Sequence, residues 1–293
     1  MKSLIEELKY SFKRKDNGLI KIILINIIIF VVVGVIFVFS HMTGYMTVLN
    51  FIQENQHLPA KFSTFMYRPW TLVTYFFSHD IQNIFHIVFN MLFLYWFGNL
   101  IVEYLGNRRL VNLYILGGIF GGIFYLLLYN LVPFFVQNNM LLLIGSSGAV
   151  YAVVVAAATL LPDYTFYLIF LGPVKIKYIA AFYLFISFLG SVGANAGGNI
   201  CHLGGALIGY IFIAQLKRGN DLGKPLSKTK DFIGNIIEKK PAMKVSYINK
   251  GKEIKPDFPD QKEIDAILDK INRSGYESLS KEEKQKLFKA SQK

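Results

Sequence analysis

The chain is organised around Gly145-Ser146-Ser147-Gly148-Ala149-Val150-Tyr151, a small and weakly polar stretch that opens an apolar run ending at Leu161. A serine–glycine opening contributes little to a membrane-spanning helix. It does place a hydroxyl at a helix N-terminus, where backbone N–H groups have no intrahelical acceptor. The run is about five residues too short to cross roughly 30 Å of hydrocarbon. We therefore expect this helix to begin inside the membrane, beside a protected cavity.

The composition is that of an integral membrane protein. Hydrophobic residues make up 53% of the 293 residues, mean hydropathy is +0.40, and charged residues make up only 17%, below the roughly 25% of soluble domains. The net charge of +12 comes mostly from the N-terminal region, short loops and the segment after Leu216. This distribution favours membrane orientation over a nucleic-acid-binding face. The single Cys201 excludes an internal disulfide, and the five histidines lack metal-binding spacing.

Six apolar segments predict an all-α membrane bundle with a short central fourth helix. We expect the spans at residues 19–40, 81–104, 110–131, 147–161, 174–189 and 199–216. Helix is the expected structure because only a helix or a closed barrel satisfies its own backbone in lipid. The longest connection, residues 41–80, is rich in aromatic residues, which indicates a place in the interface. Within it we expect Arg68 to anchor the loop by bonding carbonyl groups.

The sequence divides into four parts. A cytosolic amphipathic N-terminus covers residues 1–18, the six-span domain 19–217, a linker 218–260 and a small helical C-terminal tail 261–293. Six spans place both termini on one side, and most loop cations gather on that side, which predicts cytoplasmic termini. Ser280 with Glu283 predicts a capping box in the tail. The residue usage and the lack of a transit peptide favour a multi-pass plasma membrane protein, with the bacterial inner membrane as the expected site.

Three polar residues on different spans are expected at one depth. Ser147 begins the fourth span, His202 lies about three residues into the sixth, and His86 about five residues into the second, all from the extracytoplasmic side. Polar groups inside spans are expensive and indicate function. Ser147 with His202 supplies a nucleophile and a general base. Ser146 is the alternative nucleophile. Tyr151, one turn after Ser147, is placed to stack on the imidazole and orient it.

The second and sixth spans supply supporting groups. His86 and Asn90 are four residues apart and share a helix face, and both carry donors suited to an oxyanion hole together with the Ser147 backbone N–H. Gly204, Gly205 and Gly209 are expected to let the sixth span approach the fourth. The aromatic stripe of the fifth span is interpreted as lipid-facing or packing.

These patterns together resemble the rhomboid family of intramembrane serine proteases over residues 19–217. The motifs are Gly145-x-Ser147-Gly148 with Tyr151, His86-x-x-x-Asn90, and His202-x-Gly204-Gly205-x-x-x-Gly209. The resemblance implies a Ser147–His202 dyad, an oxyanion hole containing His86 and Asn90, and a six-helix bundle without metal or cofactor. It also implies cleavage of single-span transmembrane substrates within the lipid bilayer.

Other interpretations stand beside this one. Ser147 and Tyr151 are also residues that pack helices, and His86 with Asn90 is also an ordinary interhelical hydrogen-bonding pair. The alternative function is a catalytically silent rhomboid-like membrane scaffold that binds client helices. That alternative predicts loss of the serine or the histidine, and both are present. A transporter predicts charged midplane residues or paired broken helices, which the sequence lacks.

Overall fold

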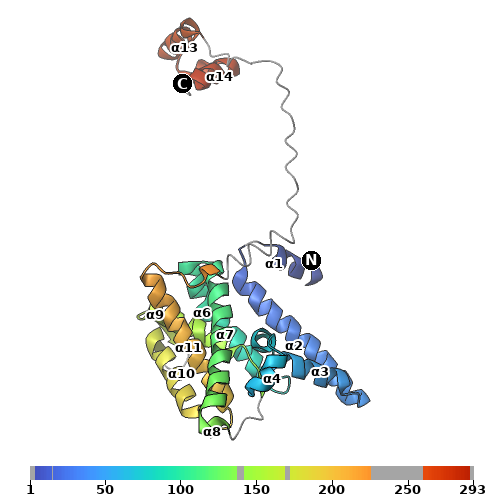
Figure 1. Cartoon of the computed structure of the whole chain (residues 1–293). Helices are drawn as coiled ribbons and strands as arrows, with labels where there is room; N and C mark the ends of the chain where they lie inside the picture. Colours follow the sequence, from blue (N-terminus) through green and yellow to red (C-terminus); the bar gives the residue numbers. More distant parts are fainter. Residues whose placement is uncertain (1–3, 15, 137–141, 169–171, 226–259, 291–293) are drawn as a thin grey trace. The chain divides into compact units, whose positions relative to one another are not determined.

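The computed structural model describes residues 4–14, 16–136, 142–168, 172–225 and 260–290. The chain forms two compact units, Met1–Glu238 and Lys239–Lys293, each described here by itself. Most of the linker expected at 218–260 lies outside the described residues. The first unit is a set of packed helices with two short two-stranded sheets (Figure 1).

The described elements of the first unit follow the apolar pattern of the sequence. They are α1 (Leu4–Lys13), α2 (Gly18–Thr43), α3 (Thr47–Gln56), β1 (Leu58–Pro59), α4 (Phe62–Tyr67), α5 (Thr71–Thr74), η1 (Tyr75–Phe77), α6 (Ile84–Leu105), α7 (Asn107–Leu131), α8 (Pro133–Val136), β2 (Leu142–Leu143), α9 (Ser147–Leu160), β3 (Thr165–Leu168), β4 (Gly172–Lys175), α10 (Ile176–Gly190) and α11 (Ala196–Lys217).

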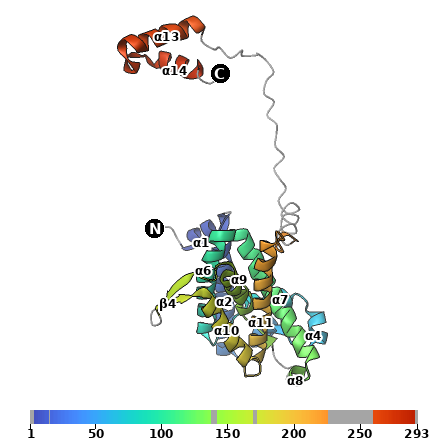
Figure 2. The ribbon, with the colours of Figure 1, turned by 90° about the vertical axis from the view of Figure 1, so that its left-hand side faces the viewer.

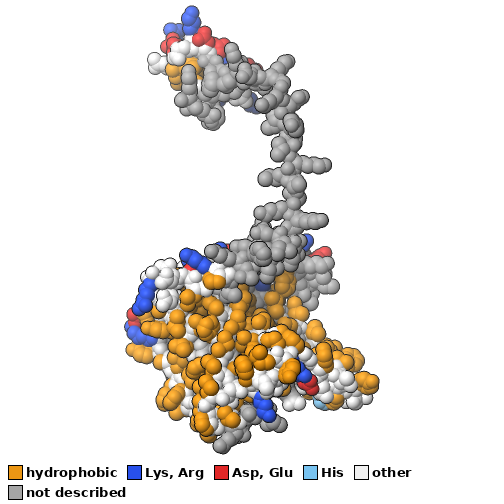
Figure 3. Space-filling model, viewed as in Figure 1, with side chains coloured by type: hydrophobic (Ala, Val, Ile, Leu, Met, Phe, Trp, Pro, Cys, Tyr) orange, Lys and Arg blue, Asp and Glu red, His pale blue; other side chains and the backbone are white. Residues whose placement is uncertain are grey.

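Within the described residues, four helices are long and apolar enough to cross a membrane: α2, α6, α7 and α11. The helices α9 and α10 are also apolar and have 14 and 15 residues. Hydrophobic side chains cover most of the first unit in the view of Figure 3, and charged side chains lie at its margins. This surface is suited to lipid, in which exposed apolar side chains carry no penalty.

The two small sheets correct the purely helical expectation. Strand β1, in the connection before α6, pairs antiparallel with β2, just before α9 (Leu58 opposite Leu143). Strands β3 and β4 form a hairpin between α9 and α10, with Thr165 opposite Lys175, and it protrudes from the side of the helices in Figure 2. Strands β1 and β2 have two residues each and β3 and β4 have four, at or below the lower limit of the about four to eight alternating residues that indicate a strand, so the sequence did not predict them.

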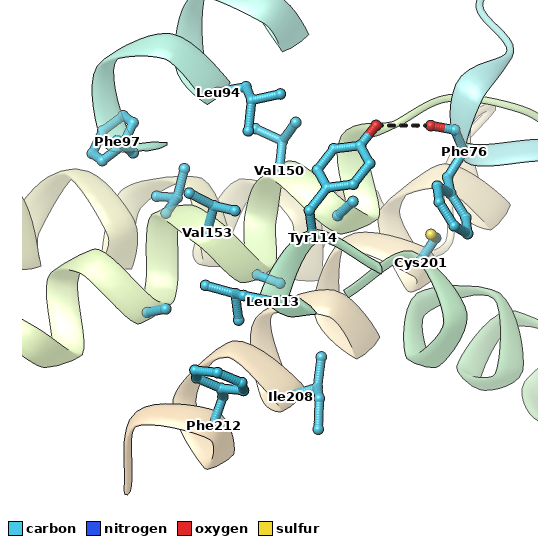
Figure 4. Packing of buried hydrophobic residues seen from close by; sticks show 14 of the residues in the cluster. Phe76, Leu94, Phe97, Leu113, Tyr114, Val150, Val153, Cys201, Ile208 and Phe212 are labelled. Atoms are coloured by element: carbon cyan, nitrogen blue, oxygen red, sulfur yellow. Dashed lines mark hydrogen bonds between the residues drawn. The ribbon is translucent and has the colours of Figure 1, made fainter. Parts of the chain in front are cut away.

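The central element of the core is α9, which contacts α6, α7, α10 and α11. Nearly all its residues from Gly148 to Ala158 are buried, and most are alanine or valine. Small side chains let the four neighbouring helices approach this helix closely. Close packing of this kind holds helices together in lipid, where the hydrophobic effect does not drive them together. Figure 4 shows Val150 and Val153 of this helix among buried side chains of α6, α7 and α11.

Buried and partly buried hydrogen bonds connect α2, and the segment before α6, to α7. The Asn26 amide donates to the Tyr114 hydroxyl (3.1 Å), and that hydroxyl donates to the Phe76 carbonyl oxygen (3.0 Å; Figure 4). The Leu19 N–H, in the first turn of α2, donates to the Asn107 side chain (3.1 Å). These bonds satisfy polar groups that would be costly to bury alone.

The second unit contains α13 (Gln261–Ser274), η2 (Tyr276–Ser278) and α14 (Lys281–Ala290). The expected capping box is confirmed: the Ser280 N–H donates to Glu283 Oε2 (2.7 Å), and the Glu283 N–H donates to Ser280 Oγ (3.2 Å). An ion pair between Lys270 and Glu283 (2.9 Å) joins the two helices.

Candidate active site

Ser147 and His202 form a direct side-chain contact between α9 and α11. Ser147 is the first residue of α9, and its Oγ lies 2.8 Å from Nε2 of His202. Gly145, two residues earlier, has φ +120°, a conformation that L side chains rarely adopt. Its N–H donates to the Tyr75 carbonyl oxygen (3.1 Å). This anchored glycine turn starts the helix with the hydroxyl directed at the imidazole.

The ring of Tyr151 stacks on His202. The ring centroids are 4.1 Å apart and the planes differ by 10°. Tyr151 lies one turn after Ser147, so the hydroxyl and the ring approach the imidazole from the same helix. The geometry fits a ring that limits rotation of the histidine.

The neighbouring serine has a different partner. Ser146 is fully buried, and its Oγ lies 3.0 Å from Nε2 of His79. His79 is in the connection before α6, outside the long helices, and burial lowers its pKa to about 3, which keeps the ring neutral. Ser146 therefore connects this loop to the start of α9, whereas Ser147 contacts His202.

A cavity of about 750 Å³ brings the expected site residues together. Its lining includes Ser147, Tyr151 and His202, together with His86 and Asn90 of α6. Aromatic side chains of α6 and α10 line it as well, among them Phe93 and Tyr183. This combination of apolar walls and a few convergent polar groups is typical of a ligand-binding site.

His86 and Asn90 line the same cavity as Ser147 but are not bonded to it. The Asn90 amide nitrogen donates to the His86 carbonyl oxygen (2.7 Å), one turn back along α6. A Cβ atom added to Gly145 would lie 2.8 Å from His86 Nε2 and 3.6 Å from Ser147 Oγ. The absence of a side chain at Gly145 therefore leaves room for the His86 ring against the turn that precedes Ser147.

Glycines bring α11 against α9, with one correction to the expectation. A Cβ at Gly205 would meet the Gly148 carbonyl oxygen, and one at Gly209 would lie 2.9 Å from the Ala152 Cα. Gly204, expected on the same face, instead meets Phe124 of α7 (2.5 Å from Cβ to Cβ). Adjacent residues on a helix are rotated by about 100°, so Gly204 and Gly205 face different neighbours.

The expectation for Arg68 is confirmed. Its Nη1 donates to the Glu54 carbonyl oxygen (2.9 Å), and Nη2 pairs with the Glu54 carboxylate (2.9 Å). The Arg68 carbonyl also accepts a bond from Thr71 Oγ1 (2.6 Å). These contacts tie α3 to the segment between α4 and α5.

Sequence reasoning missed Ser187. This residue of α10 is 1% exposed; its Oγ lies 3.1 Å from His202 Nδ1 and donates to the Tyr151 hydroxyl (2.9 Å). The signal was present, because Ser187 is a polar residue within an apolar span and such residues require a reason. The aromatic residues around Ser187 instead favoured a packing or lipid-facing interpretation of the whole span. Among the described residues, no group of three or more His, Cys, Asp or Glu side chains is arranged to hold a metal.

Comparison with known proteins finds two family models that match different parts of the chain. A family model described as the Rhomboid domain matches residues 67–218, just over half of the chain. A second, described as a family of unknown function, DUF6576, matches residues 258–293.

Two curated proteins of Arabidopsis thaliana are similar to the chain. RHOMBOID-like protein 12, mitochondrial, is 33% identical over 159 residues, which cover 51% of this chain and 47% of that protein. Rhomboid-like protein 16, chloroplastic, is 27% identical over 174 residues, 55% of this chain and 53% of that protein. The chain thus spans about half the length of the curated relatives it matches.

Proposed function

The chain belongs to the rhomboid family, and on this premise we propose that it is an intramembrane serine endopeptidase. The observation that carries the proposal is the 2.8 Å contact between Ser147 Oγ and His202 Nε2 inside the cavity. A serine hydroxyl is a weak nucleophile until a base removes its proton, and a neutral imidazole nitrogen at this distance is such a base.

The chemistry follows from these two groups. Ser147 Oγ attacks the scissile carbonyl carbon while its proton passes to His202 Nε2. The tetrahedral intermediate collapses, the carbon–nitrogen bond breaks, and Nε2–H returns the proton to the leaving amine. A water molecule then attacks the acyl group, with His202 again as base, and releases Ser147.

The oxyanion is assigned to donors around Ser147. The first intrahelical bond of α9 runs from the Val150 N–H to the Ser146 carbonyl (2.9 Å), so the Ser147 N–H starts the helix without an acceptor four residues back. His86 and Asn90, which line the same cavity, supply side-chain donors. We propose that Asn90 turns its amide from the His86 carbonyl toward the oxyanion when substrate is bound.

The proposed substrates are single-span membrane proteins. The cavity of about 750 Å³ has walls of aromatic side chains such as Phe93 and Tyr183, which suit apolar side chains of a transmembrane helix. A helix must unwind locally to present its peptide bond to Ser147, because helical hydrogen bonds occupy its carbonyl groups.

The proposed topology has six spans, formed by α2, α6, α7, α9, α10 and α11. The 14 residues of α9 extend only about 21 Å. Because α9 is surrounded by other helices, its ends need not be exposed to lipid. An ion pair from Arg109 to Asp221 (3.0 Å) and a bond from Lys217 Nζ to the Thr159 carbonyl (2.9 Å) join ends of α7, α9 and α11. We assign this cation-bearing side, with both termini, to the cytoplasm of a bacterium, and the protein to its inner membrane.

Cleavage in proteoliposomes tests the function. Wild-type protein, Ser147→Ala and Ser146→Ala are each incubated with a model single-span substrate, and labelled with a fluorophosphonate. We expect Ser147→Ala to lose cleavage and labelling, and Ser146→Ala to retain a labelled serine. Full cleavage by Ser147→Ala would overturn the assignment. Binding of substrate by a wild-type protein that neither cleaves nor labels would favour the silent scaffold.

A further inference from the structure

Ser187 connects the proposed base, His202, to the Tyr151 ring that stacks on it. It lies on α10, is almost completely buried, and does not line the cavity. Its Oγ contacts His202 Nδ1 at 3.1 Å, on the opposite edge of the imidazole from Ser147, and the Tyr151 hydroxyl at 2.9 Å. One hydroxyl thus joins α9, α10 and α11 at the imidazole.

The number of hydrogens on Ser187 limits how these bonds are made. A serine hydroxyl has one hydrogen and two acceptor lone pairs. With Ser187 assigned as the donor to the Tyr151 hydroxyl oxygen, its remaining lone pairs are available to His202. A lone pair is satisfied by a protonated Nδ1, which in a neutral imidazole leaves Nε2 unprotonated. Nε2 is the nitrogen that faces Ser147.

We propose that Ser187 is a positioning residue that holds His202 in the tautomer able to accept the Ser147 proton. The proposal rests on the proposed function of the dyad and extends it to a third residue. When Nε2 takes the proton, the Nδ1–H continues to donate to Ser187 Oγ, and the orientation of the ring is kept. A neutral hydroxyl here takes the place that a carboxylate occupies in a serine triad.

This arrangement differs from that of Thr159, another hydroxyl-bearing residue on an apolar helix. Thr159 in α9 donates to the carbonyl four residues back (2.7 Å), the ordinary solution for a hydroxyl in an apolar helix. Ser187 directs its hydroxyl to side chains of two other helices. Because it lies outside the cavity lining, its loss is expected to change the proton-transfer step and not the binding of substrate.

The test measures turnover per active site. Fluorophosphonate labelling, carried to completion, counts competent sites in wild type, Ser187→Ala, Ser187→Thr and Ser187→Val. The maximal rate of cleavage is divided by that count to give kcat per site. Threonine and valine have similar volume, so their comparison isolates the hydroxyl from packing. Ser191→Ala is the matched control, because the Ser191 Oγ donates to the Phe188 carbonyl (2.7 Å) and not to the imidazole.

We expect Ser187→Ala to lower kcat per site about three- to tenfold, with KM unchanged. This factor corresponds to the free energy of one buried hydrogen bond. Threonine should exceed valine in kcat per site, and Ser191→Ala should match wild type. A structural role would instead lower the count of sites and leave kcat per site unchanged, and equal values for threonine and valine would also overturn the proposal. Ser147→Ala is run in parallel: if it stays active, the proposed function itself fails.

Discussion

The imidazole of His202 lies parallel to the ring of Tyr151, with centroids 4.1 Å apart and planes within 10°. The two residues come from different helices, α11 and α9, and the contact occurs beside the Ser147 hydroxyl. A second ring, Tyr183 of α10, meets Tyr151 edge-on at 6.3 Å. The stacked ring therefore occupies one face of the imidazole, and its hydroxyl is fixed by Ser187.

Replacing Tyr151 tests what the stacked ring contributes. Tyr151→Leu removes the ring and its hydroxyl, whereas Tyr151→Phe removes only the hydroxyl. Because an aromatic pair is worth about 0.5–1.5 kcal/mol, we expect the leucine variant to lose up to about tenfold in kcat per site. The phenylalanine variant should lose less. Cleavage assays normalised to labelled sites measure both, and wild-type turnover in the leucine variant would reduce Tyr151 to a packing residue.

Gly205→Ala tests the close approach of α11 to α9. The added methyl group meets the Gly148 carbonyl oxygen, so the helices must separate. Overpacking of this kind costs about 1–3 kcal/mol, and we expect a lower thermal midpoint together with a lower kcat as His202 moves from Ser147.

The matched control for Gly205 is Gly193→Ala. The nearest atom to a Cβ at Gly193 is the Gly190 carbonyl oxygen at 3.5 Å, an ordinary contact. Thermal unfolding in detergent and cleavage in proteoliposomes are compared for both variants. Equal thermal midpoints for the two variants would mean that the packing of α11 against α9 does not depend on the close contact at Gly205.

Asn90→Ala tests the oxyanion hole. Loss of one such donor costs about 100- to 1000-fold in kcat, and we expect a fall of this size with little change in KM. Asn99→Ala is a close control, because Asn99 is on the same helix and also donates to the carbonyl four residues back (2.8 Å), outside the cavity. If both variants lose the same modest amount, Asn90 serves the helix and not the reaction.

The positions of the helices were predictable from the sequence. Each of the six apolar segments overlaps one helix of the structure; the segment expected at 147–161, for example, is α9 (Ser147–Leu160). Spacing along a helix also identified shared faces, such as those of His86 with Asn90 and of Ser147 with Tyr151. These are local properties, since they depend on hydropathy and on a repeat of 3.6 residues.

Which segment packs against each face of a helix was decided by the tertiary structure. In a membrane, lipid and protein interior are equally apolar, so hydropathy does not tell which side of a helix is buried. For that reason hydropathy did not distinguish Ser187 from the exposed residues of α10. For the same reason Gly204 was expected against α9, although it faces α7.

Ser146 and Ser147 show the same division most directly. The sequence by itself determined that a small, weakly polar turn opens a short apolar helix, and it favoured Ser147 as the nucleophile with Ser146 as the alternative. Packing separated them: Ser146 contacts His79, and Ser147 contacts His202 inside the cavity. The physical reason is that chain order sets only the rotation of about 100° between neighbouring residues, whereas the partner at each angle comes from segments far away in the sequence.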